Sequence, residues 1–260
     1  MYLLLLSVTG RYKSFSTLDG KESIWKELDI SHWIQSARHC FLSALNIVDS
    51  FHDQEWVWCE GVTPRLILKC YYHTYDAENQ KVIYITEAIS DDIASCALRP
   101  LMMHSAFRPV GVVNISVLRK WITCLLNALY YLHEKADQAP IVHGHTHPVS
   151  RSPSVFRRCH NILFVRGDGL VRLGGYAWLC RQADAYQYEL STRAQNDAFV
   201  GYFPKEALFD GVWSCNVDIY ALGMTIIHFL TSEPPFHEKG SKEAILQAIK
   251  NVPSSQPVHR

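Results

Sequence analysis

Hydrophobic positions follow two different periods in the two parts of this chain. In the first third, short runs rich in β-branched and aromatic residues stand between turn residues, which is typical of strands. The runs are Arg11–Thr17, Glu22–Leu28, Leu66–Tyr75 and Lys81–Glu87. The Asp19-Gly20 pair predicts a tight hairpin turn between the first two, and Asp76–Gln80 predicts a turn between the last two.

Beyond residue 116 the period changes to that of helices. Apolar residues recur at spacings of three and four between Val117 and Leu132, which predicts a buried helix. Ile219–Leu230 is apolar all round and predicts a helix buried on every side, and Lys242–Lys250 predicts a third helix. A late hairpin is expected over residues 162–173. Strands first and helices afterwards indicate an α+β fold with two lobes.

Composition narrows the class of protein. The 260 residues carry 25 Lys and Arg against 25 Asp and Glu, and 48% of them are hydrophobic. A neutral, apolar chain is neither disordered nor a non-specific binder of nucleic acid. The eight cysteines form no C-x-x-C pair, so we expect reduced thiols in a cytoplasmic protein. A membrane-spanning helix needs about 20 consecutive apolar residues, and no apolar run in the sequence approaches that length.

Four short segments, in chain order, resemble landmarks of the protein-kinase fold. They are His143–His147 at the place of H-R-D-L-K, Asn161–Phe164 at the end of the catalytic loop, Val171–Ala177 at the place of V-K-I-G-D-F-G, and Val217–Gly223 at the place of D-x-x-S-x-G. The resemblance implies a bilobal kinase-like fold that is truncated at both ends. It implies an N-lobe over about 1–90, a connector over about 90–115, a C-lobe over about 116–252 and a frayed tail over 253–260.

Finer detail is similar to one branch of that superfamily. Val117–His133, Lys81–Glu87 and Pro140–Gly144 resemble segments of the WNK kinases, and especially of the nuclear receptor-binding protein pseudokinases. The resemblance also assigns structural roles to Asp218, which bonds catalytic-loop backbone in the family, and to Gly223.

Several positions depart from the kinase pattern. The position of the acidic metal ligand is Gly175, which leaves Asn161 as the one matched ligand, and a neutral amide is a poor sole ligand for Mg²⁺. The position of the catalytic aspartate is His145, next to the family's loop histidine, here His143. Asn161 follows His145 by 16 residues, whereas the motif separates the two by about five. An insertion therefore interrupts the loop.

The phosphate-binding features are also incomplete. Gly10 is the one glycine in Ser7–Lys13, so no glycine-rich loop cradles phosphates there. Lys26 does stand where the kinase fold has its nucleotide-binding lysine. Its glutamate partner aligns with Gln54, with Glu55 and Glu60 nearby. We therefore expect no cofactor. The one alternative is that Lys26 binds ATP without Mg²⁺.

These departures predict that the chain is not an enzyme but a pseudokinase that serves as an adaptor or scaffold for other proteins in signalling or trafficking. The alternative is an atypical active serine/threonine kinase that uses Lys26, His145 and a displaced acid, Asp168 or Asp184. A third hypothesis is a hydrolytic metal site made by His143, His145 and His147, with Cys159-His160 downstream. Loop packing is the plainer interpretation of these histidines, and we expect no metal.

Overall fold

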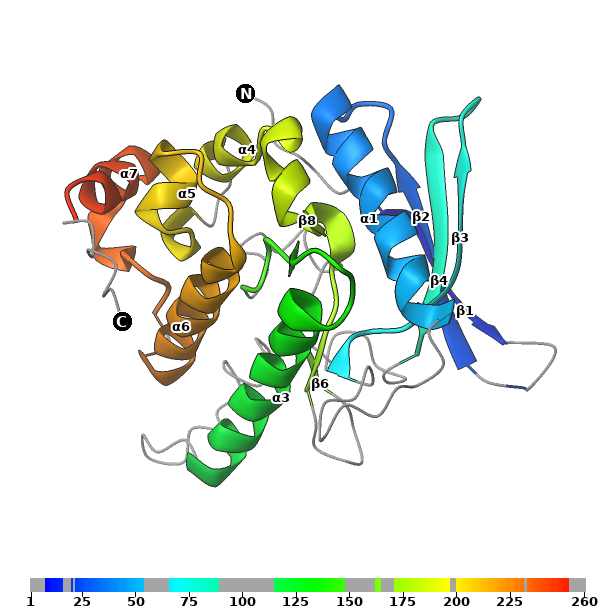
Figure 1. Ribbon diagram of the computed structural model, residues 1–260, viewed down its shortest axis with the longest axis horizontal. Coiled ribbons are helices and arrows are strands. Elements are labelled where there is room, and N and C mark those ends of the chain that lie inside the picture. The colour runs from blue at the N-terminus through cyan, green and yellow to red at the C-terminus, as the bar shows by residue number, and fades with distance from the viewer. Residues whose placement is uncertain are drawn as a thin grey trace.

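The computed structural model describes most of the chain in nine stretches. They are residues 8–15, 20, 22–53, 66–88, 115–147, 162–164, 171–196, 200–231 and 233–252. The architecture is mixed α+β: an antiparallel sheet lies on one side, helices lie on the other, and one helix stands between them (Figure 1). This is the arrangement expected of a kinase-like fold.

One four-stranded antiparallel sheet forms the first part. Its strands are β1 (Val8–Phe15), β2 (Glu22–Asp29), β3 (Cys70–Asp76) and β4 (Lys81–Glu87), in the order β1-β2-β4-β3. Both predicted hairpins are confirmed. The predicted third strand begins four residues late, because Ile67 and Leu68 pair instead with Leu173 in the other part of the molecule.

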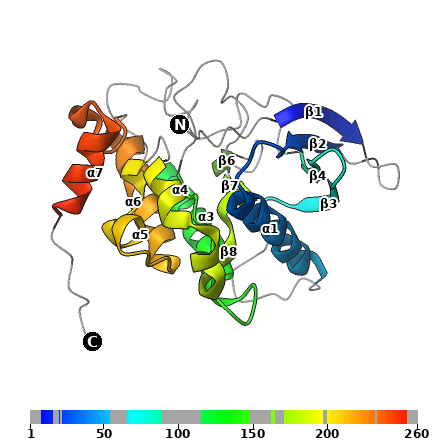
Figure 2. The ribbon, with the colours of Figure 1, turned by 90° about the horizontal axis from the view of Figure 1, so that it is seen from above.

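Helix α1 (Gln35–Asp53) packs between the sheet and the helical part (Figure 2). Its buried residues recur at helical spacing, among them Ala37, Phe41, Leu45 and Val48. The helix contacts β3 on one side and three later elements on the other: η3 (Tyr176–Trp178), β8 (Cys180–Arg181) and η4 (Gln182–Tyr188). Because α1 touches both parts, it positions the sheet against the rest of the molecule.

The helical part is built on α3 (Ile115–Glu134) and α6 (Cys215–Thr231), with α7 (Lys242–Lys250) beyond them. All three predicted helices are confirmed. Ser241 caps α7, since its side chain accepts a hydrogen bond from the amide of Ala244 at 3.1 Å. The prediction that α6 is buried on every side is wrong for the described residues, because Ile227 and Leu230 are 50% and 55% exposed.

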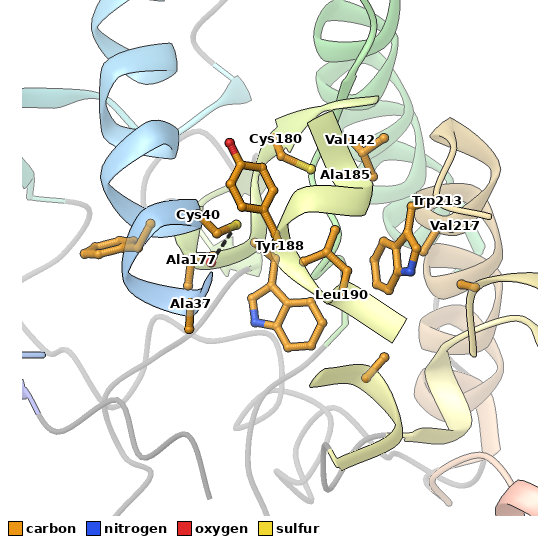
Figure 3. Close-up of a cluster of buried hydrophobic side chains, with 14 of the residues drawn as sticks. Ala37, Cys40, Val142, Ala177, Cys180, Ala185, Tyr188, Leu190, Trp213 and Val217 are labelled. Carbon is orange, nitrogen blue, oxygen red and sulfur yellow. Dashed lines mark hydrogen bonds between the residues drawn. The ribbon is translucent and has the colours of Figure 1, made fainter. Parts of the chain in front are cut away.

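Short elements complete the molecule around the large helices. They are β5 (Ile141–Val142), β6 (Ile162–Phe164), β7 (Val171–Leu173), α4 (Leu190–Asn196), η5 (Val200–Tyr202), α5 (Lys205–Phe209) and η6 (His237–Lys239). The predicted late hairpin is the β6–β7 pair. Apolar side chains from α1, β5, β8, η4, α4 and α6 meet in one core (Figure 3), which fixes these short pieces without any strong local pattern.

The cysteines within the described residues are free, and four of the five are buried, as expected. None of the helices in the described stretches has the length and apolar character needed to cross a membrane.

Candidate functional site

Asp218 organises the segment that resembles the catalytic loop. Its carboxylate is fully buried in the first turn of α6 and accepts hydrogen bonds from the backbone amides of His143 and Gly144, both at 2.8 Å. It also lies 2.9 Å from Nε2 of His133 on α3. Three partners satisfy the buried charge and fix the loop between α3 and α6. This arrangement agrees with the structural role that the family resemblance implies for Asp218.

The loop also needs a glycine at position 144. Gly144 has a φ of 71°, and a Cβ added there would come within 3.1 Å of atoms of Trp178. A side chain at this position would meet both backbone strain and a clash. An arginine, which the kinase motif has at this position, would therefore be strained here.

Three buried histidines follow one another in this loop. His143, His145 and His147 are 1%, 6% and 0% exposed. The rings of His145 and His147 meet edge to face at 4.2 Å between centroids, His145 stacks on Trp178 at 5.3 Å, and His147 stacks on Tyr202 at 4.9 Å. The position of the catalytic aspartate is therefore closed over by aromatic rings.

Burial lowers the pKa of two of these imidazoles, those of His143 and His145. The pKa of His143 is lowered, chiefly by burial, although the Asp218 carboxylate opposes the shift. The pKa of His145 is lowered well below its ordinary value by burial first, and then by the charges of His147, His143 and Arg193. No group of three His, Cys, Asp or Glu side chains in the described stretches has an arrangement that could hold a metal, and Cys159 and His160 lie outside those stretches.

The Gly175 position offers no ligand to a metal ion. Gly175 has a φ of 85° and precedes the buried η3 turn of Tyr176, Ala177 and Trp178. Asn161 lies outside the described residues. Since Mg²⁺ takes carboxylate and phosphate oxygens, the described side chains at this turn do not fit it. No step of the chemistry can be derived through a metal here.

Lys26 lies in the middle of the sheet. It pairs with Arg11 on β1 and with Tyr84 on β4, and its Nζ stands 5.0 Å from the centre of the Tyr84 ring. The charge of Lys26 also reaches the buried thiol of Cys70. Burial raises the pKa of Cys70 to about 11, Asp49 adds to the rise, and Lys26 opposes it.

Asp49 is an acidic residue of α1 that sequence reasoning missed. It influences the same thiol as Lys26, and its carboxylate lies 2.7 Å from Nε2 of His73. The predicted counterparts of Lys26, at Gln54, Glu55 and Glu60, all lie outside the described residues. Helical periodicity alone does not single out Asp49, because its neighbours Cys70 and His73 come from a distant strand.

A second group that sequence reasoning missed joins the sheet to the helical part. Glu87 at the end of β4 accepts a hydrogen bond from the amide of Lys69 at 2.8 Å and forms an ion pair with Arg172 of β7. The Tyr176 hydroxyl donates to the carbonyl of Leu68. The one signal in the sequence is that Arg172 alternates with the apolar Val171 and Leu173.

The predicted residues thus fall into two neighbouring groups. His143, His145 and Asp218 form the first, and His143 reaches the Gly175 turn because its Nε2 lies 3.0 Å from the carbonyl of Gly174. Lys26 belongs to the second. Tyr176, directly after Gly175, joins the groups, since burial raises its pKa and the nearby Cys70, Glu87 and Tyr84 add to the rise.

Two other predicted positions, Asp184 and Gly223, also lie within the described residues. Asp184 lies near Cys180 and Tyr188, whose pKa values it helps to raise. The alternative displaced acid, Asp168, lies outside the described residues. Gly223 has open space around the position of a Cβ, so close packing does not explain a glycine there.

Comparison with known proteins gives the chain distant relatives. No protein-family model matches it. It is 24% identical over 260 residues to the probable serine/threonine-protein kinase WNK10 of Arabidopsis thaliana, an alignment that covers 95% of this chain and 41% of that protein. It is 25% identical over 255 residues to the probable serine/threonine-protein kinase WNK6 of Oryza sativa subsp. japonica, covering 93% and 49%. It is 24% identical over 244 residues to the serine/threonine-protein kinase WNK8 of Arabidopsis thaliana, covering 92% and 36%.

The chain therefore spans less than half the length of these curated relatives. The matches support a protein kinase-like relationship over nearly the whole chain. The closer resemblance to the nuclear receptor-binding protein pseudokinases stays a prediction.

The prediction that the chain is not an enzyme is corrected by these relatives. All three are named as serine/threonine-protein kinases, which points to an enzyme. The prediction rested on the lost side chains at positions 145 and 175, the interrupted catalytic loop and the missing glycine-rich loop. The similarity to these kinases extends over more than nine-tenths of the chain.

Proposed function

We propose that this chain is an atypical serine/threonine protein kinase domain that binds ATP through Lys26. The observation that carries the proposal is the environment of Lys26, together with the kinase names of the relatives. Lys26 shares Cys70 and Tyr84 as neighbours with Tyr176, the residue that follows Gly175. A cation at this junction is suited to the phosphates of a nucleotide bound between the sheet and the helical part.

The chemistry assigned to Lys26 is charge neutralisation. Phosphoryl transfer depends on positioning and on offsetting the charge of the phosphate oxygens. The Lys26 ammonium is partly buried over the Tyr84 ring, where its charge is screened less than in water. Because the Gly175 turn supplies no metal ligand, Lys26 carries a larger share of this task than its counterpart in a metal-rich site.

Proton transfer in this proposal falls to His145 and to a displaced acid. A neutral imidazole accepts a proton from a substrate hydroxyl, and His145 is kept neutral by burial. Its ring is stacked on Trp178, so the η3 turn must move before a substrate reaches it. Asp168 and Asp184 are the two candidates for the acid. We propose that the substrates, like the other protein partners, are protein segments that carry hydroxyl groups.

A thermal-shift titration with ATP tests nucleotide binding, with and without Mg²⁺. ATP is expected to raise the midpoint temperature of the wild-type chain, and Lys26→Ala is expected to abolish the rise. Lys135→Ala is the matched control, because Lys135 also stands over a tyrosine ring, Tyr130 at 5.8 Å, but lies exposed after α3. A larger rise with Mg²⁺ than without it indicates that the chain binds ATP together with the ion.

A flat response of the wild-type chain to ATP, under both conditions, overturns the proposal. An equal rise in the wild type and in Lys26→Ala leaves ATP binding in place but removes Lys26 from it. Alanine variants of Asp168 and Asp184 then separate the two candidate acids, since only the acting acid lowers phosphotransfer without lowering the ATP-induced thermal shift.

A further inference from the structure

Arg193 on α4 is a buried cation with unusually few partners. The residue is 4% exposed. Nη2 donates a long hydrogen bond of 3.4 Å to the carbonyl of Ala177, while Nε and Nη1 meet no acceptor. Across the described stretches, no carboxylate forms an ion pair with Arg193. The guanidinium therefore uses few of its five N–H donors.

The groups around Arg193 are neutral. Its guanidinium carbon lies 4.4 Å from the centre of the Trp178 ring. Cys40 of α1 donates to the same Ala177 carbonyl at 3.8 Å (Figure 3). Burial raises the pKa of the Cys40 thiol despite the opposing charge of Arg193, so the thiol stays protonated. The neighbouring His145 is also neutral, because burial lowers its pKa. None of these groups carries a negative charge.

An uncompensated buried charge is expensive, and arginine cannot avoid it by losing its proton. A cation–π contact recovers only part of the cost. Guanidinium groups pair most strongly with the oxygens of carboxylates and phosphates. A protein segment does not reach a residue that is 4% exposed, so the partner that fits this place is a small ion.

We propose that Arg193 anchors a binding site for a small inorganic oxyanion of the phosphate or sulfate type, at the junction of α1, η3 and α4. The site is independent of ATP binding at Lys26, since it lies among different residues. Its physical role is to offset the Arg193 charge and so to hold α4 and η3 against α1. Removing the oxyanion loosens this junction. Removing the Arg193 guanidinium makes the oxyanion unnecessary.

The test uses the whole 260-residue chain and inorganic phosphate as the probe. Thermal unfolding is followed as phosphate replaces chloride at constant ionic strength. The midpoint of the wild type is expected to rise and saturate, by about 3 to 6 °C at ten times the dissociation constant. Arg193→Met is expected to lose this response and keep only the weak, non-saturating stabilisation that phosphate gives to any protein.

Arg181→Met is the matched control. Arg181 lies in β8, which also contacts α1, but its side chain is 40% exposed and pairs with Asp137 at 2.6 Å. This variant is expected to keep the wild-type response. A saturating response in Arg193→Met equal to that of the wild type contradicts the proposal, as does a wild type that does not respond.

A second measurement serves if Arg193→Met does not fold. Equilibrium dialysis of the wild-type chain against labelled phosphate, with chloride as competitor, counts the bound ions. One phosphate per chain that is not displaced by equimolar chloride, and that is lost in the charge-retaining Arg193→Lys because lysine offers no planar fork, supports the site. No stoichiometric binding overturns it.

Discussion

The surroundings of Lys26 and those of His145 differ in almost every physical respect. Lys26 lies half-buried in a sheet, near the ionisable groups Asp49 and Cys70. His145 lies buried among aromatic rings and is held neutral. The first environment favours binding of a charged ligand, whereas the second favours packing. Departures from the kinase pattern can therefore alter nucleotide binding and phosphoryl transfer to different degrees in this chain, although the two regions meet at Tyr176.

The largest expected effect comes from the carboxylate under the packed region. Asp218→Asn keeps the shape of the side chain but removes the negative charge of the carboxylate, which accepts hydrogen bonds from two backbone amides and faces His133. We expect a loss of about 3–5 kcal/mol in the free energy of unfolding, as when one partner of a buried pair is removed. Urea denaturation measures it. Asp210→Asn, at an exposed position, is the control and is expected to change stability by less than about 0.5 kcal/mol. A small loss in Asp218→Asn contradicts the organising role of Asp218.

The pH dependence of stability comes next in size. The folded-state pKa values of His143 and His145 are lowered, so the folded chain holds both rings neutral while the unfolded chain protonates them below about pH 6.5. Stability is therefore fully present above that pH and falls below it, by about 1.4 kcal/mol per pH unit for each histidine until the folded pKa is reached. Urea unfolding at pH 7.5 and pH 5.5 measures the difference.

His145→Phe sharpens this test. Phenylalanine keeps a ring against Trp178 and cannot titrate. We expect the variant to lose about half of the pH dependence, while His143, opposed by the charge of Asp218, supplies the rest. An unchanged pH dependence in the variant indicates that His145 is accessible to protons in the folded chain, contrary to its buried position.

The ion pair between the two regions has a smaller expected effect. Glu87→Gln removes the charge that faces Arg172 but keeps an oxygen for the amide of Lys69. Both charged side chains are less than one-fifth exposed, so we expect a loss of about 1–3 kcal/mol in the free energy of unfolding. Adding Arg172→Leu is expected to recover part of this loss, and no recovery argues against a direct pair.

The smallest expected effect is a gain. Gly223 lies in the middle of α6 with nothing within 4 Å of an added Cβ, so Gly223→Ala is expected to stabilise the chain by about 0.5–1 kcal/mol. The same urea experiment measures it. A loss of stability instead indicates that glycine at this position has the structural role assigned to it by resemblance.

Elements with a regular period were predictable from the sequence, and elements built by long-range packing were not. The α7 bounds agree with the prediction, because Lys242–Lys250 is amphipathic and Ser241 caps it. The apolar residues of the segment from η3 to α5 follow no regular spacing along the sequence. Its aromatic residues are held instead by side chains from α1 and α6. Local sequence carries no record of such contacts.

The candidate site divides in the same way. Motif order was enough to bring His143 and Asp218 together, because the family resemblance already related their segments. The ion pair between Glu87 and Arg172 joins residues 85 positions apart, and although both stand in segments that resemble kinases, the resemblance does not pair them. Its recognition required the fold.

The proposed phosphoryl transfer has to take place although the catalytic-loop region is closed over by aromatic rings. The most direct measurement is transfer of the labelled γ-phosphoryl group of ATP to a generic protein substrate by the purified chain, with Lys26→Ala and Lys135→Ala in parallel. We predict transfer by the wild type and by Lys135→Ala, and none by Lys26→Ala. Absence of transfer by the wild-type chain at every ATP and Mg²⁺ concentration, or equal transfer by Lys26→Ala, contradicts the claim.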